Sequence, residues 1–257
     1  MTAWPERGLW PRRLEVVREL ALADFRLKYQ GSILGYAWSM LSPLLMLAIY
    51  FFVFRYVLGV TTPGYLVYLF VGLVYWSFFQ DCTFSGLNAL AAKAGVLRSI
   101  HVPPGWVVAA GALSTVITLA INTSVLIVVL AVVGRLSRYA PLALVPLFCL
   151  VLLATGVAFL VALAHVHFRD TGLIWGILLQ AWFWLTPVVY VVEPGPLAEV
   201  LYLNPLARCL FLIRWFLVYD YLPSLRFAVL TVGACIAVFV MGAALFLRRQ
   251  HTVPEAL

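Results

Sequence analysis

Six stretches of the sequence run for more than 20 residues without an Asp, Glu, Lys or Arg. A helix needs about 20 consecutive apolar residues to cross the hydrocarbon core of a bilayer, so each stretch is long enough for one crossing. The pattern therefore predicts an all-α membrane protein with six transmembrane helices. The helix of the second stretch is expected to begin at Tyr65 and to continue beyond the stretch to about Leu90. The stretches are Tyr29–Phe54, Tyr56–Gln80, Val102–Gly134, Tyr139–Phe168, Thr171–Val192 and Phe227–Leu247.

The composition excludes a soluble domain. Hydrophobic residues make up 65% of the chain and charged residues 11%, whereas soluble domains carry roughly 45–50% and about 25%. The net charge of +7 comes from basic residues scattered between apolar stretches. They form no patch interleaved with aromatic residues, which argues against a nucleic acid partner. The four cysteines lack metal-ligand spacing, so we expect small buried core residues and no metal site.

The distribution of Lys and Arg predicts the orientation in the membrane. Six crossings put both termini on one side, and of the 17 basic residues eleven fall on that side and six on the other. Cytoplasmic loops carry the excess of positive charge, so we expect a multi-pass protein of the plasma (inner) membrane with both termini cytoplasmic. The smaller group consists of Arg55, Arg135, Arg138, Arg208, Arg214 and Arg226.

The segment before the first crossing has a different pattern. Apolar residues recur there every three or four positions, while charged residues occupy another face. We therefore expect residues 1–28 to form a cytoplasmic amphipathic helix in the membrane interface. An ordinary solvated helix packed on its own domain is the alternative. The apolar positions are Trp10, Leu14, Val17, Ala21 and Phe25.

A second unusual segment, Glu193–Leu222, lies between the fifth and sixth crossings. Its apolar part, Leu206–Val218, is only about 13 residues long and carries Arg208 and Arg214, too short to cross a bilayer. We expect short re-entrant outer helices buried against protein. An ordinary outer loop is the alternative.

Few residues suggest chemistry. The chain has two lysines, Lys28 after Leu27 and Lys93 after Ala92, so the Gly-Lys-Ser/Thr end of a phosphate-binding loop is absent. We expect no catalytic residue and no cofactor in this chain.

Asp81 is an acid inside an apolar stretch. A carboxylate within the apolar core of a membrane costs several kcal/mol unless it is paired or hydrated. Two roles remain open, a structural hydrogen bond to a neighbouring helix and a role on a transport path.

Aromatic side chains are candidates for the lining of a conduit. Trp175 and Trp182 lie seven residues apart, on one helical stripe beside Phe183. Aromatic rings could stack on sugars, although most such residues in membrane proteins face lipid or pack between helices. The candidate conduit residues are Tyr36, Trp38, Tyr50, Asp81, Trp175, Trp182 and Phe183.

The stretch DFRLKYQGSILGYAWSMLSPL, from Asp24 to Leu44, resembles the lead-in helix and first span of ABC-2 type permeases that export polysaccharides. That family includes exporters of lipopolysaccharide O-antigen, teichoic acid and capsule. Pro103-Pro104 departs from the family, which often has Arg after the first Pro. Three further pieces resemble the family in order: Lys93–Arg98 followed by Ile100–Pro104, Phe168–Asp170, and Leu185–Val188 with Asn204–Leu206.

The resemblance implies an ABC-2 type transmembrane domain over residues 29–257. It also implies a homodimer that works with two copies of a separate ABC ATPase subunit, which would bind ATP and Mg. The expected substrate is a lipid-linked polysaccharide taken from the cytoplasm. The alternatives are an ABC-2 exporter of a drug or lipid, a secondary transporter and a membrane-embedded enzyme. For a secondary transporter we would expect several acidic residues within the membrane, whereas Asp81 stands almost alone.

The loop Lys93–Pro104 is the candidate contact with the ATPase. Apolar residues recur there at three- and four-residue spacing between two basic residues, which suits a short helix seated in a cleft of a partner. An ordinary positively charged cytoplasmic loop is the alternative. The candidate coupling residues are Lys93, Val96, Leu97, Arg98 and Ile100, with Arg169 and Asp170 as a second, smaller contact.

Overall fold

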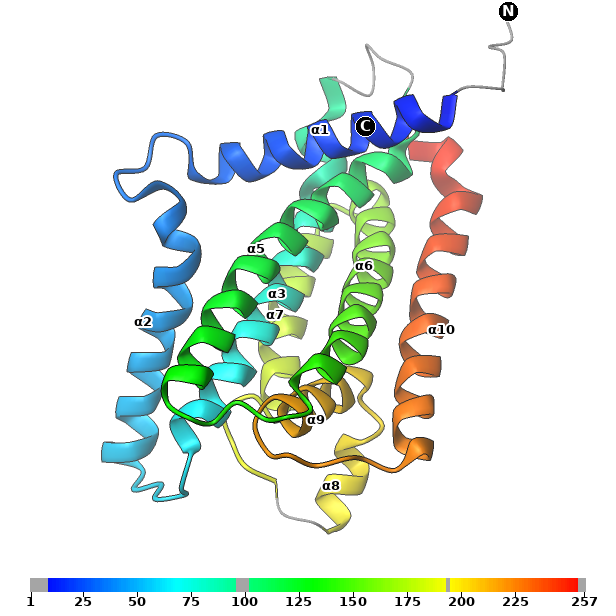
Figure 1. The fold of residues 1–257 in the computed structure, drawn as a ribbon. Helices are drawn as coiled ribbons and strands as arrows, with labels where there is room; N and C mark the ends of the chain where they lie inside the picture. Colours follow the sequence, from blue (N-terminus) through cyan, green and yellow to red (C-terminus); the bar gives the residue numbers. More distant parts are fainter. Residues whose placement is uncertain (1–8, 96–101, 193–194, 254–257) are drawn as a thin grey trace, which may run out of the picture.

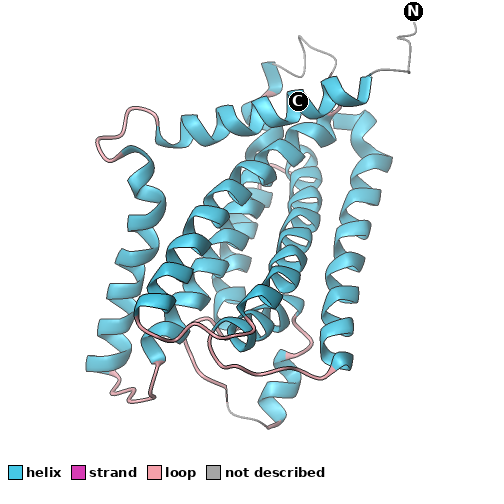
Figure 2. Ribbon diagram, in the orientation of Figure 1, coloured by secondary structure: helices cyan, strands magenta, loops and turns pink. Residues whose placement is uncertain are grey.

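The structure is a computed structural model that describes residues 9–95, 102–192 and 195–253. Figure 2 shows helices and loops, and no strand, in these residues. The prediction of an all-α protein is confirmed for this part of the chain.

Five helical segments in the described residues are long and apolar enough to cross a membrane. Each has at least 20 residues, so each reaches about 30 Å at 1.5 Å per residue. They are α2 (Trp38–Phe52) continued by the π-helix Val53–Val57, α3 (Tyr65–Ala92), α5 (Pro104–Val132), α6 (Leu144–His167) after the 3-10 turn Ala140–Ala143, and α10 (Leu225–Arg249) with the turn Gln250–Thr252.

The first and fifth predicted crossings differ most from the structure. Helix α2 begins at Trp38 instead of Tyr29, because the chain turns at Gly31 and Gly35, which take φ values of +77° and +51°. Helix α7 (Thr171–Trp184) has 14 residues and ends before Pro187. Proline lacks an N–H and disfavours helical geometry in the residue before it. A helix of that length reaches only about 21 Å, so a sixth crossing stays a prediction.

Helices α3 and α6 lie at the centre of the bundle. Helix α3 packs against α5 and α6, and α6 also packs along α10. Leu69, Phe79 and Leu150 are fully buried between them. The apolar residues of α3 surround the helix instead of forming one stripe, as expected for a helix enclosed by others.

Helix α1 (Leu9–Tyr29) lies across one end of this bundle (Figure 1). Val17 and Ala21 are buried there against Ala110 of α5, while Glu15 and Arg18 are exposed. One apolar side of α1 therefore packs on its own domain. Its place in a membrane interface stays a prediction.

The predicted short helices exist at the opposite end of the bundle, as α8 (Pro196–Leu201) and α9 (Pro205–Leu217). Helix α9 is largely buried. Asn204 caps it by accepting from Leu206 N, and also donates to Thr186 Oγ1 at 2.9 Å. An ordinary loop is thereby excluded for residues 205–217, whereas the depth of α9 in a membrane stays a prediction.

The four cysteines are buried and free, which confirms their prediction as small core residues. Cys209 of α9 and Cys235 of α10 place their sulfur atoms 3.5 Å apart.

Candidate functional site

A cavity of about 830 Å³ lies between α2, α3, α5 and α7. Helix α2 stands beside the bundle with little of its surface buried (Figure 1). Its residues from Trp38 to Tyr50 form one wall of the cavity, and α3 and α7 form the walls opposite. The separation of α2 from the central helices thus creates the cavity.

Aromatic rings from three helices line the cavity. Trp76 of α3 meets Phe183 of α7 edge to face, with ring centroids 5.3 Å apart. Tyr50 of α2 lies 5.8 Å from the same Phe183 ring. Such rings offer flat apolar surfaces with a negative face. The aromatic lining residues are Trp38, Tyr50, Trp76, Phe84, Phe183 and Trp184.

Uncharged polar side chains make up much of the remaining wall. Thr118 and Asn122 lie one turn apart on α5, and each is 8% exposed. Within the described part of the chain, Thr118 Oγ1 has no hydrogen-bond partner. Buried polar groups normally have one, so this hydroxyl is available to a ligand or a water molecule. The set comprises Ser32, Ser39, Ser42, Ser77, Gln80, Thr118, Asn122 and Gln180.

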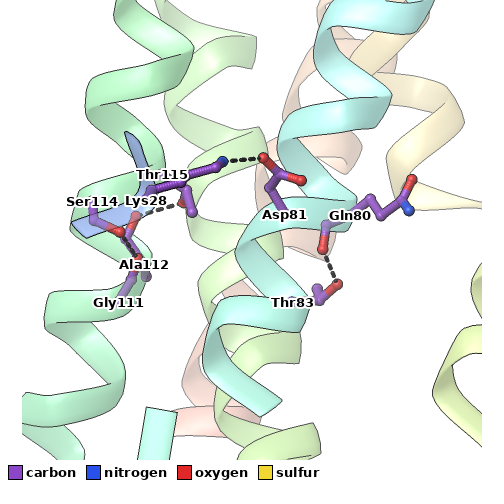
Figure 3. A network of polar contacts seen from close by, with 8 residues as sticks. All are labelled: Lys28, Gln80, Asp81, Thr83, Gly111, Ala112, Ser114 and Thr115. Atoms are coloured by element: carbon purple, nitrogen blue, oxygen red, sulfur yellow. Dashed lines mark hydrogen bonds and ion pairs between the residues drawn. The ribbon is translucent and has the colours of Figure 1, made fainter. Parts of the chain in front are cut away.

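The charged residues of the described cavity wall are Lys28 and Asp81, and they form an ion pair. Lys28 Nζ, from the last turn of α1, lies 2.7 Å from Asp81 Oδ2 of α3 (Figure 3). Each side chain is a little under half exposed, so the pair contributes no more than about 1 kcal/mol to stability. Asp81 therefore has a structural partner and also faces the cavity.

The predicted conduit residues divide into three groups. Trp38, Tyr50, Asp81 and Phe183 line the cavity. Trp175 and Trp182 do not. The Tyr36 side chain lies outside the described part of the structure.

The two tryptophans outside the cavity wall take part in packing between α7 and α3. Buried Trp175 donates from Nε1 to Thr83 Oγ1 at 3.2 Å. Trp182 packs edge to face on Phe79, with ring centroids 5.4 Å apart.

Trp76 and the polar residues of the cavity wall were not among the predicted conduit residues. Asn122 and Gln180 are amides inside charge-free stretches, and Thr118 lies one helical turn before Asn122. That pattern of polar residues was the available signal, because polar groups inside membrane spans tend to face the bundle or a cavity.

The predicted coupling residues are only partly described. Lys93, which follows α3, forms an ion pair with Asp24 of α1 at 2.5 Å. Arg169 and Asp170 are exposed between α6 and α7. Val96, Leu97, Arg98 and Ile100 lie outside the described residues. Lys93–Asp24 and Lys28–Asp81 together connect α1 to α3 at two points.

Comparisons with known proteins give one matching family model and several similar proteins that share a name. A family model described as ABC-2 type transporter matches residues 15–218. An O-antigen export system permease protein RfbA of Klebsiella pneumoniae is 27% identical over 245 residues, which cover 91% of this chain and 92% of that protein. A protein of the same name from Myxococcus xanthus is 28% identical over 196 residues, covering 73% of this chain and 74% of the relative.

Proposed function

Because this chain belongs to the ABC-2 type transporter family, we propose that it is the permease subunit of an ATP-driven exporter that moves a lipid-linked polysaccharide out of the cytoplasm. The cavity carries this proposal. Aromatic rings stack on the C–H faces of sugar rings, and uncharged hydroxyl and amide groups hydrogen-bond to sugar hydroxyls. The wall combines both kinds of group on facing helices.

The relatives support the same substrate class. Two proteins from Klebsiella pneumoniae and one from Myxococcus xanthus are named as permeases of O-antigen export. Their identities of 24–28% extend over most of this chain. An O-antigen is therefore the proposed cargo, and a teichoic-acid-like polymer is a second candidate that the family resemblance alone supports.

The proposed topology has six crossings of the plasma (inner) membrane with both termini cytoplasmic. The described ends of α1 and α10 lie at the same end of the bundle, opposite α8 and α9 (Figure 1). Helix α7 and the segment that follows it would form the fifth crossing in chain order and bring the total to six. In this arrangement α1 lies along the cytoplasmic surface, and α8 and α9 lie at the outer end.

Energy would come from a separate ABC ATPase dimer, which would bind ATP and Mg. The contact would be the loop Lys93–Pro104, with Arg169 and Asp170 as a second, smaller contact. The Lys93–Asp24 pair supports this role, because movement at the end of α3 would also move α1. One turn further along α1, Lys28 holds Asp81 at the cavity.

A homodimer would complete the conduit. Ser39 and Pro43 are the buried residues of α2, and most of its apolar side chains are exposed or half-buried. A second copy, or lipid, would have to cover the remaining surface. Two such cavities facing one another would line a path between the two subunits.

Filling the cavity tests the proposal. Ser42 on α2 is exposed and lines the cavity, so Ser42→Trp should obstruct the path without disturbing buried packing. In cells whose own copy is deleted, we expect the wild-type chain to restore surface polysaccharide and Ser42→Trp to leave lipid-linked polysaccharide inside. The readouts are surface labelling and extraction of the lipid-linked pool.

The matched control is Ser124→Trp on α5. Ser124 is exposed and does not line the cavity. Normal export by Ser124→Trp with loss in Ser42→Trp supports the proposal. Unchanged surface polysaccharide after deletion, together with increased accumulation of a drug or lipid inside the cell, would instead identify an ABC-2 exporter of a drug or lipid.

A further inference from the structure

The charge on the cavity wall suggests which polymers can pass. We infer that the cavity accepts uncharged glycans and rejects polyanionic ones, such as polymers linked through phosphodiesters. This inference rests on the proposed function and narrows its substrate class to an uncharged O-antigen-like glycan, because a teichoic-acid-like polymer is linked through phosphodiesters. It follows from the absence, in the described cavity wall, of any cation other than Lys28, which is paired with Asp81.

The ion pair leaves the wall without net charge. Lys28 and Asp81 contribute one positive and one negative charge, 2.7 Å apart and together on one side of the cavity. The walls from α5 and α7 contribute polar groups without formal charge, at Thr118, Asn122 and Gln180. A second copy of the same wall would add no unpaired cation.

A polyanion would meet unfavourable surroundings on this path. A charge that leaves water for the interior of a membrane protein needs an opposite charge or a water-filled channel. The face of an aromatic ring carries partial negative charge and does not attract an anion. Lys28 attracts a neighbouring phosphate little, because Asp81 lies 2.7 Å from its Nζ and cancels its charge. The hydroxyl and amide groups of the wall can replace the hydrogen bonds that sugar hydroxyls make with water, but they cannot neutralise the charge of a phosphate.

The inference concerns the repeating units of the polymer. Many charged units would occupy the path in succession, and each would bear the same penalty. A phosphate group on the lipid carrier would cross only once per chain. Discrimination therefore grows with the number of anionic repeats in the cargo.

The experiment compares two polymers built on the same lipid carrier, one neutral and one with a phosphodiester in each repeat. Cells without their own permease receive this chain and its ATPase, and surface polymer is measured with specific antibodies. We expect at least about tenfold less export of the anionic polymer. Gln180→Lys and Asn122→Lys, which place a cation in the cavity, should each reduce that ratio several-fold.

Asn88→Lys is the matched control. Asn88 lies on α3, is exposed and is outside the cavity wall, so its replacement adds the same charge elsewhere and should leave the ratio unchanged. Equal export of both polymers by the wild-type chain would overturn the inference. So would an unchanged ratio in both cavity lysine variants when they reach the membrane in normal amounts. Export of neither polymer by a wild-type chain that is inserted and bound to its ATPase would overturn the proposed function itself.

Discussion

Arg214 is 1% exposed, and its guanidinium group binds backbone carbonyl oxygens instead of a carboxylate. It donates to Pro187 O at 2.6 Å, to Val188 O at 2.9 Å and to Tyr68 O at 3.1 Å. The group also lies 3.4 Å from the centroid of the Tyr68 ring. Gly72 leaves room for it, since a Cβ there would overlap both Arg214 Nη2 and Val188 O. One side chain thus joins α9 to α3 and to the segment after α7.

Replacement of Arg214 should therefore weaken the end of the bundle that holds α9. Arg214→Met leaves buried carbonyl oxygens without their donor, which costs about 1–3 kcal/mol. Arg214→Lys should recover little, because an ammonium group lacks the planar fork that reaches several acceptors. The measurement is the midpoint temperature at which detergent-purified protein stops eluting as a single species.

Arg226→Met is the control for this measurement, since Arg226 is exposed at the start of α10. A midpoint for Arg214→Met no lower than that of Arg226→Met would contradict the assigned role.

At the residue scale, sequence identified Asp81 as unusual but could not supply its partner. Lys28 lies 53 positions earlier in the chain, and the two meet only because α1 folds back across the bundle. Trp38, Tyr50 and Phe183 were predictable as candidates because aromatic rings can stack on sugars, but aromatic residues make up 15% of the chain, so residue type alone could not rank them. Which ring faces the cavity depends on helix rotation, which the nearly uniform apolar pattern does not encode.

At the scale of elements, the closest helix contact joins α6 and α10. A Cβ on Gly242 would overlap the carbonyl group of Gly156, and a Cβ on Gly156 would overlap the backbone of Phe239. Small residues allow helices in membranes to approach closely and gain van der Waals contact. Backbone atoms cannot move aside cheaply, so these two positions determine the spacing of the helices.

Gly242→Ala should separate α6 from α10 and lower the midpoint of thermal unfolding by several degrees, equivalent to about 1–3 kcal/mol. Gly233→Ala on the same helix should leave the midpoint unchanged or raise it slightly, because nothing lies within 4 Å of a Cβ there and alanine favours helix. The midpoint temperature at which the detergent-purified protein stops eluting as a single species distinguishes the two variants. Equal effects of the two changes would show that helix propensity, and not the contact, determines the result.

The bounds of the helices were predictable where a charge or a turn limited them. Helix α3 was expected from Tyr65 to about Leu90 and runs from Tyr65 to Ala92, because Gly64 and Lys93 flank a run in which Asp81 is the one charged residue. The predicted first crossing was too long, since residues 30–37 are uncharged but turn at two glycines. The absence of charge shows what a bilayer tolerates, and it does not show where a helix begins.

At the scale of the whole molecule, the orientation can be tested by labelling engineered cysteines. Leu203, between α8 and α9, is 84% exposed, and His251 is exposed after α10. In spheroplasts, an impermeant maleimide should label Leu203→Cys at once and His251→Cys only after permeabilisation. The native cysteines can stay in place because they are buried.

The reverse labelling pattern would contradict the proposed topology, because it would mean either an inverted protein or one in which α7 does not cross. Labelling of both positions in intact spheroplasts would mean that α10, the one candidate crossing between them, does not cross the membrane. Ser137, in the loop between α5 and α6, is less suitable for labelling because it is 5% exposed and donates to Asp220.

The position of α1 also has a consequence for synthesis. Its binding partners, Asp81, Lys93 and Ala110, all come later in the chain. At about 5–20 residues per second, the ribosome needs several seconds to reach Ala110 after completing Tyr29. During that interval the protein surface that α1 covers is incomplete, and the apolar face of α1 must be covered by something else, such as lipid. A newly made α1 that could not rest on lipid would be exposed to chaperones and proteases before its final position existed.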